Sequence, residues 1–154
     1  MPNKSVLILN GPGLADLKSE DGSNDLSLDM IRGECDTLCA NLDIDLDFRQ
    51  TDDEQQMLKF ISDDSQSFSA LVINPSCLRY GTPQKLNAFD SAIKQVAHLR
   101  KPVIEVRLSN IFADPAETMP PMQGIDGGLG FVNGMGAAGY LLAIRAADRK
   151  LRAA

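Results

Sequence analysis

An alternation of short apolar runs with longer segments of helical period is the feature that most constrains the fold of this chain. Val6–Leu9 and Ala70–Ile73 are uninterrupted apolar runs, and Pro102–Val106 is broken only by one glutamate. Each run is stopped at its carboxyl end by Asn, Gly, Pro or a charged residue. Runs of this length between turn signals are typical of parallel strands that are buried on both faces.

The segments between the runs predict amphipathic helices. In them, apolar residues recur every three or four positions, as on the buried face of a helix. Ser27 and Thr82 stand where N-caps are expected, and Pro83 follows Thr82 at the first helical position. The predicted helices cover residues 27–42, 53–64, 82–99 and 136–151.

Two further strands complete the pattern. Residues 44–48 alternate apolar with charged side chains, which indicates a half-exposed strand at a sheet edge, and residues 130–133 form a short fifth strand. The order predicts an α/β fold: one flavodoxin-like, doubly wound domain over residues 1–154, with a five-stranded parallel sheet in strand order 2-1-3-4-5. Its ligand crevice should lie at the carboxyl ends of the first, third and fourth strands.

Composition narrows the class of partner. The 154 residues carry a formal net charge of −6, which argues against nucleic-acid binding, since that needs a basic face. The apolar run at Val6–Leu9 is too short for a signal peptide or a membrane span. With three cysteines and no leader, a cytoplasmic location is expected. Cys35 and Cys39 share one helical face and are best explained as small buried residues.

Three patterns that suggest specialised chemistry have plainer explanations. Residues 134–139 fit G-x-G-x-x-G, but the chain lacks the βαβ unit that should follow, so a tight turn with close helix packing is expected. Residues 52–54 are acidic, as is typical of a helix N-terminus, and we predict no metal site. His98 falls late in a helix, away from the strand ends, which leaves the crevice without a histidine base.

Candidate ligand-binding residues stand where the predicted strands end. Asn10 ends the first strand, Asn74 ends the third, and Arg107 follows Glu105 at the end of the fourth. Glu105 and Arg107 are two positions apart and therefore share a face of the strand. Arg107 could pair with Glu105, contact an anionic ligand, or do both.

Arg79 and Tyr80 come shortly after the third strand. Together with Arg107 they would make the crevice cationic within an acidic protein. An arginine can bind a carboxylate or phosphate through two parallel hydrogen bonds, so an anionic ligand is expected.

Five segments in order resemble the type II 3-dehydroquinate dehydratase family. Its motifs Leu-Asn-Gly-Pro, Gln-Ser-Asn-His-Glu, Ile-Asn-Pro, Glu-Val-His-Leu-Ser-Asn and a glycine-rich start of the C-terminal helix are matched, respectively, at residues 9–12, 50–54, 73–75, 105–110 and 136–143. The resemblance covers nearly the whole chain. It implies a flavodoxin-like fold, a homododecamer built from trimers, and a cofactor-independent lyase that removes water from a small carboxylated substrate through an enolate.

The resemblance also implies roles for individual residues. Leu108 and Ser109 would anchor the substrate carboxylate, Asn74 would contact the substrate, and Glu105 matches the glutamate that braces the general-acid histidine. That histidine is Arg107 here, and the asparagine after Asn-Gly-Pro is Gly13. The lid segment lacks the family's basic tyrosine and its arginine, and Lys18 is its only cation.

These replacements leave three hypotheses open. The first is a diverged enzyme that acts on a small carboxylated substrate. In it Arg107 and Arg79 bind anionic groups, and Tyr80, Glu105 and Lys18 are the candidates for proton transfer. The second is a binding or assembly protein that uses the same crevice without turnover. The third is residual dehydration of 3-dehydroquinate through replaced residues.

Overall fold

The computed structural model describes residues 4–17, 26–75, 83–108 and 129–153. Their central feature is a five-stranded sheet in the order β2-β1-β3-β4-β5, with every pair of neighbours parallel. The strands are β1 (Lys4–Asn10), β2 (Ile44–Gln50), β3 (Ala70–Asn74), β4 (Val103–Arg107) and β5 (Leu129–Asn133). The predicted fold class and strand order are confirmed.

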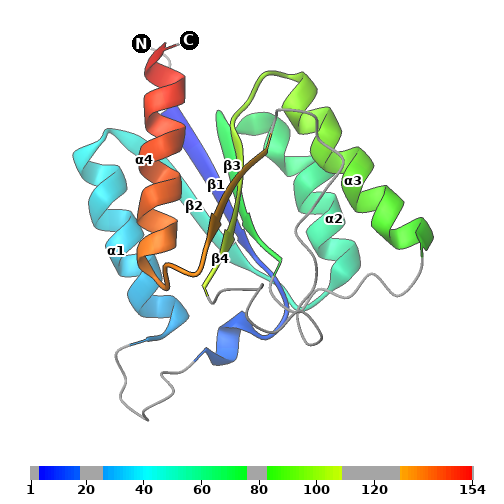
Figure 1. Cartoon of the computed structure of the whole chain (residues 1–154), viewed down its shortest axis with the longest axis horizontal. Helices are drawn as coiled ribbons and strands as arrows, with labels where there is room; N and C mark the ends of the chain where they lie inside the picture. The colour runs from blue at the N-terminus through cyan, green and yellow to red at the C-terminus, as the bar shows by residue number, and fades with distance from the viewer. Residues whose placement is uncertain (1–3, 18–25, 76–82, 109–128, 154) are drawn as a thin grey trace.

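Helices cover both faces of this sheet (Figure 1). On one face lie α1 (Leu28–Asn41) and α4 (Ala138–Ala153), and on the other lie α2 (Glu54–Ser62) and α3 (Pro83–His98). Two short 3-10 turns complete the described elements, η1 (Leu14–Asp16) and η2 (Asp64–Ser67). None of the described helices has the length and apolarity that a membrane span requires.

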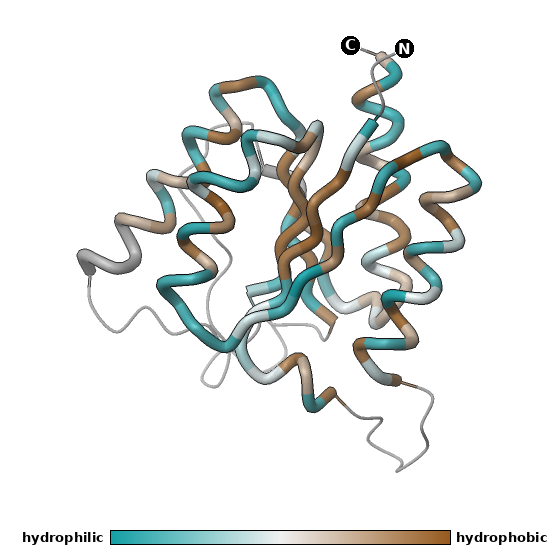
Figure 2. The backbone as a smooth tube through the Cα atoms, turned by 180° about the vertical axis from the view of Figure 1, so that it is seen from behind, coloured by the Kyte–Doolittle hydropathy of each residue, from teal (hydrophilic) through white to brown (hydrophobic). Residues whose placement is uncertain are grey.

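Each face of the sheet has its own apolar core. In Figure 2 the central strands are mostly brown, the colour of hydrophobic residues. Val6 and Ile8 of β1 pack toward α1 and α4, whereas Leu7 and Leu9 pack toward α2 and α3. All four side chains are fully buried, because the central strands have helices on both sides. The edge strand β2 is different: Phe48 is buried but Asp45 is exposed, as its alternating sequence predicts.

Local signals set where the described helices begin and end. The Ser27 hydroxyl accepts from the Met30 N–H, which confirms it as an N-cap, and the Asp53 carboxylate caps α2 by accepting from Gln55. The second helix ends at Ser62, two residues before its predicted end, because η2 continues the chain there. The Lys101 ammonium donates to the backbone carbonyls of η2 and ties it to the loop before β4.

The glycine-rich segment after β5 is a turn with close helix packing, as predicted. Gly134 and Gly136 have positive φ angles of 78° and 58°. A Cβ on Gly139 would lie 3.2 Å from Val106 Cγ1, so the absence of a side chain lets the start of α4 approach the sheet. The segment therefore closes the fold rather than cradling a dinucleotide.

The tightest backbone approach, at Gly11, gives the first prediction. A Cβ there would lie 2.4 Å from the backbone oxygen of Pro75. We expect Gly11→Ala to lower the free energy of unfolding by about 1–3 kcal/mol, because the backbone must shift to relieve the overlap. Gly33→Ala is the control: it meets nothing within 4 Å on an exposed face of α1. It should stabilise the helix by up to about 1 kcal/mol.

Urea denaturation of both variants beside the unsubstituted protein measures these changes. A Gly11→Ala midpoint equal to that of the unsubstituted protein would contradict the assigned close approach between the ends of β1 and β3.

Candidate functional site

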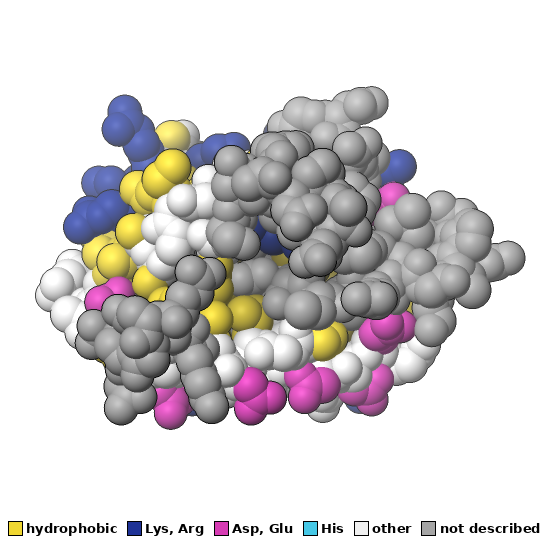
Figure 3. Space-filling view, turned by 60° about the horizontal axis from the view of Figure 1, so that its bottom comes forward, with side chains coloured by type: hydrophobic (Ala, Val, Ile, Leu, Met, Phe, Trp, Pro, Cys, Tyr) yellow, Lys and Arg dark blue, Asp and Glu magenta, His cyan; other side chains and the backbone are white. Residues whose placement is uncertain are grey.

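The ends of β1, β3 and β4 meet at one edge of the sheet. Asn10 and Asn74 are register partners on the last rung between β1 and β3, and the Gly11 N–H donates to the Asn74 carbonyl at 2.8 Å. The strand order reverses between these two strands, which is where open α/β sheets form a ligand crevice. In Figure 3 this edge is turned toward the viewer, with acidic side chains along the lower rim and basic ones at the upper left.

The candidate side chains divide between the two faces of the sheet. Asn10 and Asn74 hydrogen-bond to a residue of α4, so they lie on the α1–α4 face. Glu105 and Arg107 alternate with Val106, which belongs to the α1–α4 core, and they therefore lie on the opposite face. The structure brings the backbones of these residues to one edge but separates their side chains into two clusters.

Glu105 and Arg107 form one of these clusters as a buried ion pair. Arg107 Nε lies 3.2 Å from Glu105 Oε2, and the two side chains are 5% and 0% exposed. Both are held by the extended backbone of β4, which places alternate side chains on one face. The ion pair considered from the sequence is thus confirmed, and it fixes the guanidinium at the end of the strand.

The second cluster links three strands to α4. The Tyr140 hydroxyl donates to Asn10 Oδ1 at 2.6 Å, and Asn74 Nδ2 donates to the same hydroxyl at 2.9 Å. Asn10 Nδ2 donates in turn to the backbone carbonyl of Arg49 on β2, at 2.9 Å. Burial is the largest cause of the raised pKa of Tyr140, which therefore stays a neutral phenol with a proton to donate.

Tyr140 falls within the predicted helix over residues 136–151, and it was not among the candidate site residues that the sequence indicated. The available signal was its burial, since a buried tyrosine hydroxyl requires a hydrogen-bond partner. The partners could not be read from the sequence, because Tyr140 is 130 residues from Asn10 and 66 from Asn74.

The end of β4 is held by the glycine-rich turn. The backbone N–H of Gly134 donates to the Arg107 carbonyl at 3.1 Å, and that of Gly136 donates to the Leu108 carbonyl at 2.9 Å. The Leu108 side chain packs against the α1–α4 core. The G-x-G-x-x-G segment at residues 134–139 thus holds the backbone at Leu108, the first of the two residues predicted to anchor the substrate carboxylate.

Gly13, which replaces an asparagine in the family resemblance, is held by an acidic residue after β2. Its backbone is left-handed, with φ 87°, and its N–H donates to Asp52 Oδ1 at 3.1 Å. Gln50 donates to the same carboxylate oxygen and to the Gly11 carbonyl. Asp52 was expected only to complement a helix dipole, and the structure adds this second role at the loop after β1.

Four predicted site residues lie outside the described residues: Lys18, Arg79, Tyr80 and Ser109. Their roles stay predictions. The predicted N-cap at Thr82 also lies there.

The described titratable groups away from the strand ends are consistent with structural roles. His98 is exposed and is the last residue of α3, as predicted. Cys35 and Cys39 are buried and free, and burial raises their pKa to about 12 and about 11, so both thiols are protonated at neutral pH. Among the residues described, His, Cys, Asp and Glu form no group of three that could hold a metal ion.

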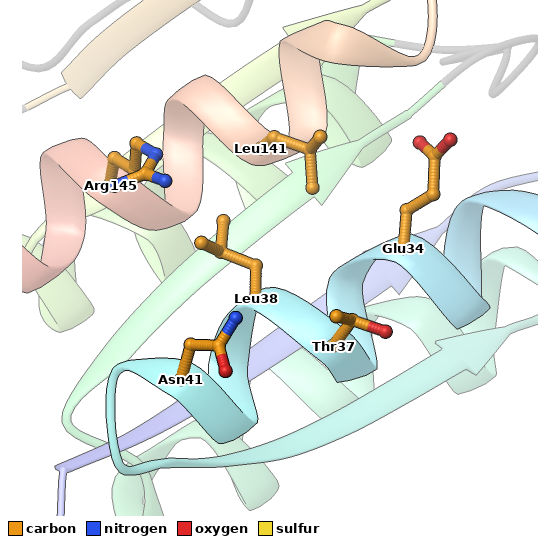
Figure 4. A pocket seen from close by; sticks show the side chains of 6 residues that line it. All are labelled: Glu34, Thr37, Leu38, Asn41, Leu141 and Arg145. Carbon is orange, nitrogen blue, oxygen red and sulfur yellow. The ribbon is translucent and has the colours of Figure 1, made fainter.

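A groove of about 390 Å³ lies between α1 and α4 (Figure 4). The side chains of Leu38 and Leu141 point into the space between the two helices. Thr37 and Asn41, with the charged Glu34 and Arg145, complete the lining. This groove lacks the converging acid, base or nucleophile that a catalytic site needs.

Comparison with known proteins decides the family. A family model described as dehydroquinase class II matches residues 4–148. The chain belongs to the dehydroquinase class II family. A 3-dehydroquinate dehydratase of Chelativorans sp. (strain BNC1) is 34% identical over 155 residues, covering 96% of this chain and 99% of that relative.

Solved structures agree with this assignment. The type II dehydroquinase from Propionibacterium acnes has a TM-score of 0.76 and 28% identity, and the match covers 95% of this chain and 98% of that one. A 3-dehydroquinate dehydratase-like protein from Bifidobacterium longum has a TM-score of 0.69 and 25% identity, with 96% and 98% covered. The resemblance inferred from five short motifs is confirmed.

The buried ion pair gives the second prediction. We expect Arg107→Met to lower the free energy of unfolding by about 3–5 kcal/mol, because it leaves the Glu105 carboxylate buried without its paired guanidinium. The double variant Arg107→Met/Glu105→Leu should recover part of the lost free energy of unfolding, since it removes both charges.

Arg152→Met is the matched control, because Arg152 is 67% exposed and its buried partner Asp148 keeps a second ion pair, with Lys4. Arg152→Met should lower the free energy of unfolding by less than about 1 kcal/mol. Equal denaturation midpoints for Arg107→Met and Arg152→Met would contradict the large cost that we expect from removing the guanidinium beside the buried Glu105 carboxylate.

Proposed function

We propose that this chain is a diverged dehydroquinase class II lyase that acts on a small carboxylated substrate without a cofactor. The observation that carries the proposal is the Arg107–Glu105 pair, at 3.2 Å, where the family resemblance places a histidine and its bracing glutamate. The family's relatives named above are dehydratases, which are lyases. This chain keeps the bracing glutamate as Glu105 and replaces the histidine that it would brace with Arg107.

The exchange of histidine for arginine alters the chemistry. Arginine remains protonated at neutral pH and cannot deliver a proton as an imidazolium can. A guanidinium held in place can still neutralise a carboxylate or the negative charge that develops on an enolate oxygen. In our proposal Arg107 therefore acts by charge, while Glu105, Tyr80 and Lys18 are the candidates for proton transfer.

The remaining roles follow the family motifs. Leu108 and Ser109 would anchor the substrate carboxylate, with Asn10, Asn74 and Arg79 as further contacts. We also expect a cytoplasmic homo-oligomer, a trimer-based dodecamer as in the family.

Binding without turnover is the second candidate. It is favoured by the Asn10 amide, whose two ends both bond within the protein, to the Arg49 carbonyl and to the Tyr140 hydroxyl. In that case the crevice would hold a small carboxylate, or support assembly, without catalysing a reaction. Residual dehydration of 3-dehydroquinate is the third candidate.

The third prediction separates residual dehydration from the other two functions. Two general acid–base groups of the family, the histidine and the lid tyrosine, are replaced, and each typically contributes about 10²–10⁴-fold. We expect dehydration of 3-dehydroquinate at least about 10⁴-fold slower than that of the Chelativorans relative assayed in parallel.

Formation of the conjugated enone product, followed by its ultraviolet absorbance, is the measurement. A rate within about tenfold of the relative's would overturn the proposal of a changed reaction and make this chain an ordinary dehydratase.

The fourth prediction tests the carboxylate site itself. A panel of small carboxylic acids should include members that raise the melting temperature, because a ligand that binds only the folded state stabilises it. Arg107→Lys keeps a positive charge but loses the planar fork, so the shift should shrink for the same acids. If no acid shifts the unsubstituted protein, or if Arg107→Lys leaves every shift unchanged, the ligand role of Arg107 is wrong. Turnover of any acid that binds then distinguishes an enzyme from a binding protein.

A further inference from the structure

The groove between α1 and α4 carries opposite charges at its two ends (Figure 4). Glu34 of α1 lies at one end and Arg145 of α4 at the other, with Leu38 and Leu141 between them. Both charged residues are exposed, and neither forms an ion pair with any residue that the structure describes. The groove therefore presents one negative and one positive charge to solvent, separated by apolar side chains.

The two helices also expose apolar side chains beside these charges. Met30 comes four residues before Glu34, which places it on the same face of α1, and it is 44% exposed. On α4, Leu142 comes three residues before Arg145 and is 48% exposed. Large apolar side chains that are exposed next to one another, with charges at their margin, are typical of a protein–protein contact surface.

Helix geometry fixes the order of the charges. Glu34, Leu38 and Asn41 follow one face of α1, and Asn41 lies about 10 Å further along the helix than Glu34, at a rise of about 1.5 Å per residue. Figure 4 shows Asn41 at the same end of the groove as Arg145. Because both helices pack on the same face of the sheet, the fold holds the negative end and the positive end apart.

This arrangement is complementary to a copy of itself. In a contact with twofold symmetry, each surface meets the same surface turned in the opposite direction. With the axis passing near Leu38 and Leu141, Glu34 of one copy faces Arg145 of the other, and symmetry forms the same pair a second time. A surface with charges of only one sign would instead set like charges against each other, which opposes association.

We propose that the α1–α4 face is a docking surface for a second copy of this chain, with two Glu34–Arg145 ion pairs on either side of an apolar centre. The residues of this face are Met30, Glu34, Leu38, Leu141, Leu142 and Arg145. The contact depends neither on the proposed reaction nor on the carboxylate site. It adds a twofold contact to the expected homo-oligomer and is separate from the contacts that would build a trimer.

The fifth prediction exchanges the two charges. Arg145→Glu sets two glutamates against each other in each pair, and Glu34→Arg sets two arginines against each other. We expect each single variant to raise the dissociation constant of the twofold contact at least about tenfold. The double variant Glu34→Arg/Arg145→Glu restores both pairs with their signs exchanged, so its dissociation constant should return to within about threefold of the unsubstituted value.

Sedimentation velocity over a dilution series, with light scattering after size-exclusion chromatography, measures the molecular mass at each concentration. Each single variant should need at least about tenfold higher concentration than the unsubstituted protein to reach the same mass. Lys59→Glu is the matched control, because it changes the net charge as Arg145→Glu does, at an exposed position of α2 on the other face of the sheet. It should associate like the unsubstituted protein. Far-ultraviolet circular dichroism checks that every variant is folded.

Three results would overturn the twofold contact. The first is an unsubstituted protein that stays monomeric at every concentration, and the second is unchanged association in both single variants. The third is a double variant that dissociates as readily as the single variants, because the two charges then do not pair across a twofold axis. A trimer of equal mass in all of these proteins leaves the expected trimer in place and rejects only the twofold contact. Failure of the carboxylic-acid panel changes none of these masses, so the proposed function and this contact are tested separately.

Discussion

Burial of the central strands on both faces is the constraint on which the rest of this structure depends. Most side chains of β1, β3 and β4 are apolar, and nearly all of them are inaccessible to water on both faces of the sheet. A polar group in the middle of such a strand would be costly unless it were hydrogen-bonded. Asn10, Asn74 and Arg107 are therefore at the carboxyl ends of their strands, and Glu105 in the middle of β4 is paired with Arg107.

At those ends the protein stabilises two separate buried polar clusters. Asn10, Asn74 and Tyr140 satisfy one another on the α4 face, and Glu105 pairs with Arg107 on the opposite face. The Tyr140 cluster ties together elements that are far apart in the sequence, whereas the Glu105–Arg107 pair lies within β4. The glycine-rich turn after β5 completes the arrangement by donating to the carbonyls of Arg107 and Leu108.

Membership of the family does not by itself assign a reaction to this chain, because Arg107 stands where the family resemblance places a catalytic histidine. The match over residues 4–148 establishes the family, and it extends through the β4 motif in which the substitution lies. Because Glu105 and Arg107 are buried against each other, losing one of them removes the opposite charge beside the other, which is a structural reason for the two residues to occur together. The Arg107 guanidinium also lies at the edge where open α/β sheets bind ligands, which is why its proposed role is charge stabilisation.

Much of the fold could be predicted from the sequence, because the signals involved are local. The apolar runs, the alternation in β2 and the Ser27 cap each depend on neighbouring residues, and together they gave the strand order that the structure confirms. The candidate site was predicted only in part. Sequence placed Asn10, Asn74, Glu105 and Arg107 at strand ends, and it anticipated the ion pair because two positions on one strand share a face.

The sequence by itself therefore determined the layers of the fold and the edge at which its polar groups gather. Only the tertiary structure decided that Tyr140 joins Asn10 to Asn74, that Asp52 holds Gly13, and that the two polar clusters lie on opposite faces of the sheet. The physical reason is the separation along the chain over which each kind of interaction acts. Periodicity and capping act over a few residues, whereas a buried hydroxyl or amide takes whichever partner the packing of distant elements brings within about 3 Å.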